Sequence, residues 1–101
     1  MAQRDPTDLQ GQADEAEEER RKAQQRQQQE TDDFVWLMGN KRGRRIVWRL
    51  LEKAGVFRSS FSTNAMQMAF AEGSRSYGLF WLNEVMARCP EQFVNMINES
   101  K

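Results

Sequence analysis

Large apolar residues are almost absent from the first third of the chain. Between residues 1 and 33 only Met1 and Leu9 are large and apolar, and there is no aromatic residue. All ten aromatic residues lie between Phe34 and Phe93. Because burial of apolar side chains drives folding, only the second part can form a core. The pattern predicts a charged, glutamine- and glutamate-rich arm over residues 1–30 and a compact α-helical domain over residues 31–101.

The clearest helix signal lies between Gly39 and Gly55. The apolar residues there follow an i, i+1, i+4, i+5, i+8 spacing that places them on one face of a helix: Ile46, Val47, Leu50, Leu51 and Ala54. Gly55 stands where a left-handed residue commonly ends a helix. We therefore expect a helix over about residues 41–54.

A shorter helix is expected immediately before it. Thr31 is a suitable N-cap, and Gly39 with Asn40 supplies a C-terminal stop. The apolar run 34–38 between them could also form a strand. The cap, the stop and the lack of an evident partner strand favour a helix.

Two further helices are predicted after a loop at residues 58–62. Thr63 or Asn64 can cap a helix that runs to about Arg88, with Gly73 and Gly78 inside it. These glycines either allow close helix contact or break the helix near Gly73. Pro90 suits the first position of a fourth helix to about residue 98, with an apolar stripe of Phe93, Met96 and Ile97. The predicted fold class is all-α, a small bundle of about four helices.

The third predicted helix carries apolar residues on two sides. One stripe is formed by Met66, Phe70, Tyr77, Trp81 and Val85, and nearly opposite it lie Met68, Leu79, Leu82 and Met86. A helix that is apolar on two faces is either central in the fold or shared with another subunit. We therefore expect a protein-binding surface that includes this second set and the following aromatic anchors: Trp36, Trp48, Tyr77, Phe80 and Trp81.

The arm consists of a leader and a stretch of helix formers. Residues 1–12, with Pro6 and Gly11, indicate a disordered leader. Residues 13–30 contain strong helix formers and no β-branched residue, but no apolar stripe. This composition is typical of a solvated, partly helical tail, or of a helix that completes when it docks on a partner.

Charge divides the chain in the same way as hydrophobicity. Residues 1–33 carry ten acids and five bases, a net −5, and residues 34–101 carry ten bases and five acids, a net +5. Several bases gather at the start of the second predicted helix, where they oppose the helix dipole, and they form a candidate nucleic-acid surface: Lys41, Arg42, Arg44, Arg45 and Arg49. The alternative is a solvated face, or one that pairs with acids of the arm or of another subunit.

Catalytic chemistry has few candidates in this sequence. There is no histidine, which excludes Ser-His-Asp and Cys-His arrangements and histidine-ligated metal sites. Cys89 is the only cysteine, so no internal disulfide forms, and no phosphate-binding glycine motif occurs. We expect a non-enzyme without cofactor, metal or small-molecule substrate. No apolar run is long enough to span a membrane, and the polar N-terminus does not read as a secretory signal.

Residues 34–98 resemble a small domain family of tailed phages that is named after the nineteenth open reading frame of a Bordetella podophage. Its members show a G-RR-hydrophobic segment that ends in LL-x-x-x-G-hydrophobic-F, then F-x-E-G-x-R-x-x-G, then P-E-x-hydrophobic-x-x-M. The matching residues here are Gly43, Arg44, Arg45, Leu50, Leu51, Gly55, Phe57, Phe70, Glu72, Gly73, Arg75, Gly78, Pro90, Glu91 and Met96.

The resemblance implies a product of the head and portal gene cluster. From it we expect a non-catalytic virion or head-assembly protein that binds copies of itself and a larger virion protein such as the portal. It would be found in the host cytoplasm during assembly and then in the virion. The alternative functions are a small DNA-associating phage protein that uses residues 41–53, and an inhibitor of a host protein that binds through the acidic arm.

The matched polar residues suggest one structural contact. Glu72 lies beside Gly73 on the third predicted helix, and Arg45 lies near the start of the second. We expect an ion pair between Glu72 and Arg45 that fixes these helices against each other, with Gly73 and Gly78 permitting the close approach.

Overall fold

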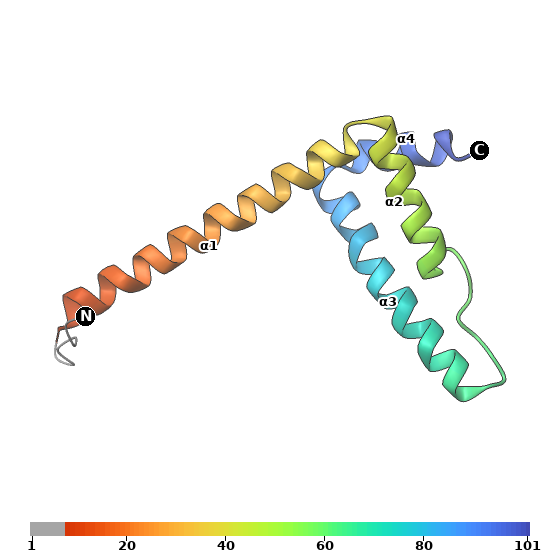
Figure 1. Ribbon diagram of the computed structural model, residues 1–101, viewed down its shortest axis with the longest axis horizontal. Helices are drawn as coiled ribbons and strands as arrows, with labels where there is room; N and C mark the ends of the chain where they lie inside the picture. Colours follow the sequence, from red (N-terminus) through yellow and green to blue (C-terminus); the bar gives the residue numbers. More distant parts are fainter. Residues whose placement is uncertain (1–7) are drawn as a thin grey trace. The chain divides into compact units, whose positions relative to one another are not determined.

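The computed structural model describes residues 8–101, and all of their regular structure is α-helical (Figure 1). The four helices are α1 (Leu9–Met38), α2 (Lys41–Ala54), α3 (Ala65–Arg88) and α4 (Pro90–Glu99). The chain divides into two compact units after Asp33, so that the last turns of α1 belong to the second unit. The predicted all-α bundle is confirmed.

The arm is more regular than its sequence predicts. Residues 13–30 lie within the continuous helix α1, with their side chains exposed. The Asp8 carboxylate accepts the Gly11 N–H at 2.8 Å, which caps the helix before Leu9. The prediction of a disordered leader is therefore wrong for residues 9–12, while residues 1–7 lie outside the described part.

The predicted N-cap at Thr31 is also wrong. The Thr31 hydroxyl donates to the Gln27 carbonyl at 3.0 Å, an i−4 bond of a residue inside a helix. The helix formers before Thr31 and the apolar residues after it are both compatible with helix, so nothing separates the two segments. The predicted end of this helix at Gly39 and Asn40 is confirmed.

Asn40 organises the turn between α1 and α2. Its side-chain amide donates to the carbonyls of Trp36 and Leu37 at 3.1 and 3.2 Å, and its side-chain oxygen accepts the Gly43 N–H at 2.8 Å. One residue thus satisfies carbonyls at the end of one helix and an amide at the start of the next. This is why two helices meet across only two residues.

Helices α2, α3 and α4 occupy the predicted ranges to within a residue or two. Asn64 caps α3 by accepting the Gln67 N–H at 3.0 Å, and α3 continues through Gly73 without a break. Gly55 ends α2 with φ 84°, the left-handed conformation expected of it. Pro90 begins α4.

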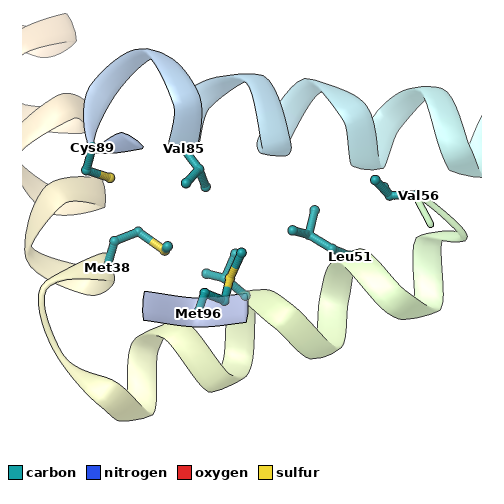
Figure 2. Packing of buried hydrophobic residues seen from close by; sticks show 7 residues of the cluster. Met38, Leu51, Val56, Val85, Cys89 and Met96 are labelled. Carbon is teal, nitrogen blue, oxygen red and sulfur yellow. The ribbon is translucent and has the colours of Figure 1, made fainter. Parts of the chain in front are cut away.

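The core of the second unit is small and draws on all four helices. Its buried side chains are Met38, Val47, Leu51, Val56, Val85, Cys89 and Met96, and Figure 2 shows them meeting between α2, α3, α4 and the end of α1. Partly buried apolar residues pack around them, among them Phe34, Leu37 and Phe93.

Two glycines allow the helices to approach. A Cβ on Gly43 would lie 1.8 Å from the Leu37 carbonyl oxygen, and a Cβ on Gly78 would lie 2.6 Å from Ala54 Cβ and from Val56 Cγ2. The Ser74 hydroxyl reinforces the second contact by donating to the Ala54 carbonyl at 3.2 Å. The predicted role of Gly78 in close helix packing is thus confirmed, whereas Gly73 faces open space.

We predict that Gly43→Ala destabilises the domain by about 2–3 kcal/mol, because the new methyl group meets a backbone oxygen that cannot move independently. Gly73→Ala is the matched control and should stabilise the domain by up to about 1 kcal/mol, since alanine favours the helix and its Cβ meets no atom. Urea denaturation at low micromolar concentration measures both. Equal effects of the two substitutions would contradict the tight contact at Gly43.

Candidate interaction surface

The largest group of exposed apolar side chains lies on α3. Tyr77, Phe80 and Trp81 contact one another, with ring centroids 5.2–6.5 Å apart, and Phe34 adds a fourth ring 5.9 Å from Trp81. We call these four residues the aromatic patch. Tyr77, Phe80 and Trp81 are all exposed, while Phe34 is half-buried. Contiguous exposed aromatic side chains of this kind form a candidate protein-binding surface.

The helical repeat explains why these rings stay outside. Gly78 and Val85 are buried and define the face of α3 that packs on the core. Tyr77 and Phe80 lie about 100–160° around the helix from that face, since each residue advances by about 100°. The short α2 covers only one side of α3, so a second apolar side is left uncovered within residues 34–101.

The patch continues toward the start of α3. Met66 and Phe70 are 83% and 80% exposed, and Phe61 in the preceding loop is 77% exposed. The first turns of α3 extend beyond the end of α2 (Figure 1). There the loop before α3 contacts the helix through Ser60 and Glu72 and through the Ser62 hydroxyl, which lies 3.4 Å from the Gln67 side-chain oxygen.

The second apolar set predicted on α3 is divided by the fold. Leu79 and Leu82 are half-buried and pack against the core, whereas Met68 and Met86 are 37% and 48% exposed. Leu79 and Leu82 therefore serve mainly the interior. The predicted helix with two apolar sides is found, but the more exposed side is the one that carries Met66, Phe70 and Tyr77.

The two remaining predicted anchors have different surroundings. Trp36 is 73% exposed on α1. Trp48 is half-buried and stacks on Phe57, with ring centroids 4.9 Å apart and planes at 25°. Trp48 thus helps to fix the loop after α2, and Trp36 is the more accessible of the two.

Arg44 is a structural residue rather than part of the free basic surface. Its guanidinium donates to both Glu99 carboxylate oxygens, with the shortest contact at 2.6 Å, to the Met38 carbonyl at 3.0 Å and to the Gln92 side-chain oxygen at 3.1 Å. The Arg44 and Glu99 side chains are 12% and 25% exposed. This interaction, which we call the Arg44 clamp, joins the end of α1 to α2 and α4.

Sequence reasoning missed the Arg44 clamp. Glu99 lies 55 residues after Arg44, and no spacing rule links positions that far apart. The clamp keeps the pKa of Glu99 below its ordinary value, chiefly through the hydrogen bonds from Arg44, with smaller contributions from the charges of Arg44, Lys41 and Arg45. The same hydrogen bonds raise the pKa of Arg44.

The other predicted basic residues are exposed. Lys41, Arg42, Arg45 and Arg49 have no ion-pair partner within residues 8–101. Lys41, Arg45 and Trp48 line a small hollow between α2 and α4, and Glu99 lines it as well. A carboxylate in the wall disfavours an anion in that hollow, so a basic surface would lie on the outer face of α2.

The predicted ion pair between Glu72 and Arg45 is not formed. Glu72 pairs with Arg75 of its own helix at 3.5 Å and accepts a hydrogen bond from Ser60. Gly73, next to Glu72, meets no neighbouring element, so this side of α3 is not the one that α2 approaches. The polar contact that fixes α2 is the Arg44 clamp.

Within the described residues, no group of three or more histidine, cysteine, aspartate or glutamate side chains could hold a metal ion. None of the helices there combines the length and hydropathy needed to cross a membrane.

Burial raises the pKa of the Cys89 thiol, with a smaller contribution from Glu91. A buried thiol with a raised pKa is a poor nucleophile.

Comparison with known proteins identifies the domain. The sequence model described as Bbp19-like phage protein matches residues 34–98. The chain belongs to this family. The match begins at the first residue of the second compact unit, so the Bbp19-like region and the folded domain coincide. No curated protein and no solved structure matches the chain.

The structure gives physical reasons for several residues of the Bbp19-like region. Gly43 and Gly78 permit close helix contacts, Gly55 adopts positive φ, and Arg44 forms the clamp. These four residues specify the fold. Phe70 and Gly73 have no comparable role inside this domain, because both face solvent.

We predict that the Arg44 clamp makes stability depend on acid pH. The pKa of Glu99 is lowered in the folded state. The stabilisation that its carboxylate gives the folded domain is therefore complete above the ordinary glutamate pKa and is lost as the pH falls through the lowered value. The melting temperature should drop below about pH 4, and Glu99→Gln should flatten this drop while lowering stability at pH 7. Glu52→Gln, at an exposed carboxylate of α2, is the control. The same pH profile in Glu99→Gln and wild type would contradict the prediction.

Proposed function

We propose that this Bbp19-like protein is a non-catalytic virion or head-assembly protein that acts through protein–protein contacts. It works in several copies and together with a larger virion protein such as the portal. The observation that carries the proposal is the exposed apolar surface of α3, with Met66, Phe70, Tyr77 and Phe80 each more than half exposed. Membership of a phage family supplies the biological setting.

Leaving this apolar surface of α3 exposed to water is unfavourable in free energy. Burying apolar area contributes about 25 cal/mol per Å², and large aromatic side chains dominate the energetics of interfaces. The nearest charged residue beside the patch on α3 is Glu84, one turn after Phe80 and Trp81, and it is paired with Arg88 at 3.2 Å. A partner with a complementary apolar surface would remove the patch from water.

The chain also offers little for catalysis. Among residues 8–101, Cys89 is the one buried nucleophile, and the other ionisable groups with a shifted pKa belong to the Arg44 clamp. An assembly role requires only a stable domain, an apolar binding surface and an accessible arm. The exposed helical residues 13–30, which carry charges of both signs, suit contacts with a second virion protein.

We predict that the protein is incorporated in particles or their assembly intermediates in more than one copy, and that incorporation requires the aromatic patch. The test uses the phage that encodes the chain, with the protein supplied from a plasmid and quantified by mass spectrometry in purified particles. Phe80→Glu should reduce incorporation at least tenfold, because a charge in the centre of an apolar interface costs on the order of a hot-spot residue.

Val94→Glu is the matched control, because Val94 is exposed on α4 and the new charge is the same. It should be incorporated like wild type. Absence of the protein from both particles and intermediates would overturn the proposed function.

A DNA-associating role is the second candidate, and the unpaired bases on the outer face of α2 favour it. Lys41, Arg42, Arg45 and Arg49 present four positive charges along one helix. Phosphate contacts of this kind give affinity that falls steeply with salt. The loss of Arg44 to the clamp weakens this candidate, since the residue is committed inside the domain.

If DNA is bound by this face, changing Arg42, Arg45 and Arg49 together to Gln should weaken duplex binding and reduce the slope of log K against log salt by roughly 0.9 per lost contact. The same change at Arg20, Arg21 and Arg26 of the arm is charge-matched and should leave binding intact. Fluorescence anisotropy with duplex DNA measures both. No binding by the wild type at low salt would reject this candidate.

A further inference from the structure

The exposed apolar residues of α3 form a regular stripe with a glycine at its centre. Met66, Phe70, Gly73, Tyr77 and Phe80 follow one another at intervals of four, three, four and three residues, the repeat of a coiled-coil seam. We call these five residues the α3 seam. The four side chains are 83%, 80%, 67% and 53% exposed in chain order, and a Cβ on Gly73 would meet nothing within 4 Å.

We propose that the α3 seam binds the α3 seam of a second copy of this chain, with the two helices antiparallel and crossing at Gly73. This inference rests on the proposed function, because it names the first partner in the assembly. It deepens that function by assigning the surface, the orientation and the residues that meet.

The spacing of the seam is almost symmetric about Gly73, which is what self-pairing requires. The apolar residues lie seven and three positions before Gly73 and four and seven positions after it. A two-fold axis at Gly73 therefore places Met66 opposite Phe80 of the second copy and Phe70 beside its Tyr77. A two-fold interface buries the same surface on both partners, and sulfur–aromatic and aromatic pairs are favourable contacts.

Gly73 would have a packing role in the dimer that it lacks in the single domain. A glycine inside a helix lowers helix stability relative to alanine, and Gly73 fits no neighbouring element in the described chain. At the crossing point of two helices, the missing side chain allows the backbones to approach closely, as Gly78 does against Ala54 within the domain. The aromatic residues on either side then fill the space along the seam.

Charge does not oppose the pairing. The positions that flank the seam on α3 are Ala69, Ser74, Ser76 and Trp81, none of which is charged. Glu72 pairs with Arg75 on the same helix, and Glu84, which continues the line of the seam one turn after Phe80, pairs with Arg88. The loop 55–64 contacts α3 through Glu72 and Gln67, neither of which belongs to the seam, and it leaves the seam side chains exposed.

The apolar area of the α3 seam is consistent with a dimer of modest affinity. The four exposed side chains of the seam present roughly 500 Å² per copy, estimated from the size of large buried side chains. A standard interface buries roughly 800 Å² per partner, so the seam and its flanking residues approach this size. The dimer should therefore form at micromolar or higher concentration and strengthen when copies are gathered on a particle.

Sedimentation equilibrium of the full chain from about 1 to 500 µM tests the pairing. We expect a monomer–dimer equilibrium that Phe70→Glu weakens about a hundredfold, the scale of a hot-spot loss, and that Val94→Glu leaves unchanged. Gly73→Leu should also abolish the dimer while raising the thermal stability of the monomer, because leucine favours the helix and the site is open. A wild type that stays monomeric throughout, or a dimer that tolerates Phe70→Glu and Gly73→Leu, would overturn the proposal.

Cysteine cross-linking tests the antiparallel orientation. With the axis at Gly73, Ala69 lies beside Ser76 of the second copy, whereas two copies of Ala69 are offset by about 12 Å along the helices. Ala69→Cys with Ser76→Cys in one chain should give a covalent dimer on oxidation, and neither single variant should, because native Cys89 is buried. Cross-linking by a single variant at equal yield, or none by the double variant, would contradict this arrangement.

The test of the dimer and the test of the proposed function can fail independently. A dimer formed through the seam by a protein that is absent from particles and intermediates would refute the assembly role alone. Incorporation in particles by a protein that never dimerises through the seam would refute the inference alone.

Discussion

The small size of the hydrophobic core is the constraint on which the rest of the structure depends. Residues 34–101 enclose seven buried apolar side chains. They come from the end of α1, from α2 and Val56 after it, from α3, from Cys89 between α3 and α4, and from α4. An interior this small cannot also enclose the remaining large apolar side chains of a 24-residue helix. The fold therefore needs tight helix contacts at Gly43 and Gly78 and the polar Arg44 clamp, and it leaves one side of α3 in water.

The residues of this domain fall into two groups, those that stabilise the helix packing and those that face solvent. The Arg44 clamp, Asn40 and three glycines determine where the helices begin, end and cross. Phe70, Gly73 and Tyr77 take no part in this and yet lie in the region that matches the Bbp19-like family. A surface role for these residues accounts for both observations, and an apolar seam with a central glycine is best suited to another helix.

Much of the fold could be predicted because its signals are local. The apolar spacing after Ile46, the glycine at position 55, the asparagine caps and Pro90 each act within one or two turns, and α2, α3 and α4 follow them closely. The start of α1 could not be predicted in this way, because Thr31 can serve equally as a cap or as an interior residue. The Arg44–Glu99 pair joins distant residues, and the choice of Glu99 over Glu72 depends on which side of α2 each helix meets. The exposure of Ile46 and Leu50 likewise depends on how much of α2 its neighbours cover.

Hydroxyl-radical footprinting would show directly whether the α3 seam is covered when the protein is assembled. Met66 and Met96 are the informative pair, since the first is 83% exposed and the second 1% exposed in the domain. Oxidation would be compared between the dilute protein and purified particles or assembly intermediates. We expect Met66 to be oxidised rapidly in the dilute protein and to be strongly protected in the assembly, while Met96 stays protected in both. Equal oxidation of Met66 in the two states would contradict this expectation.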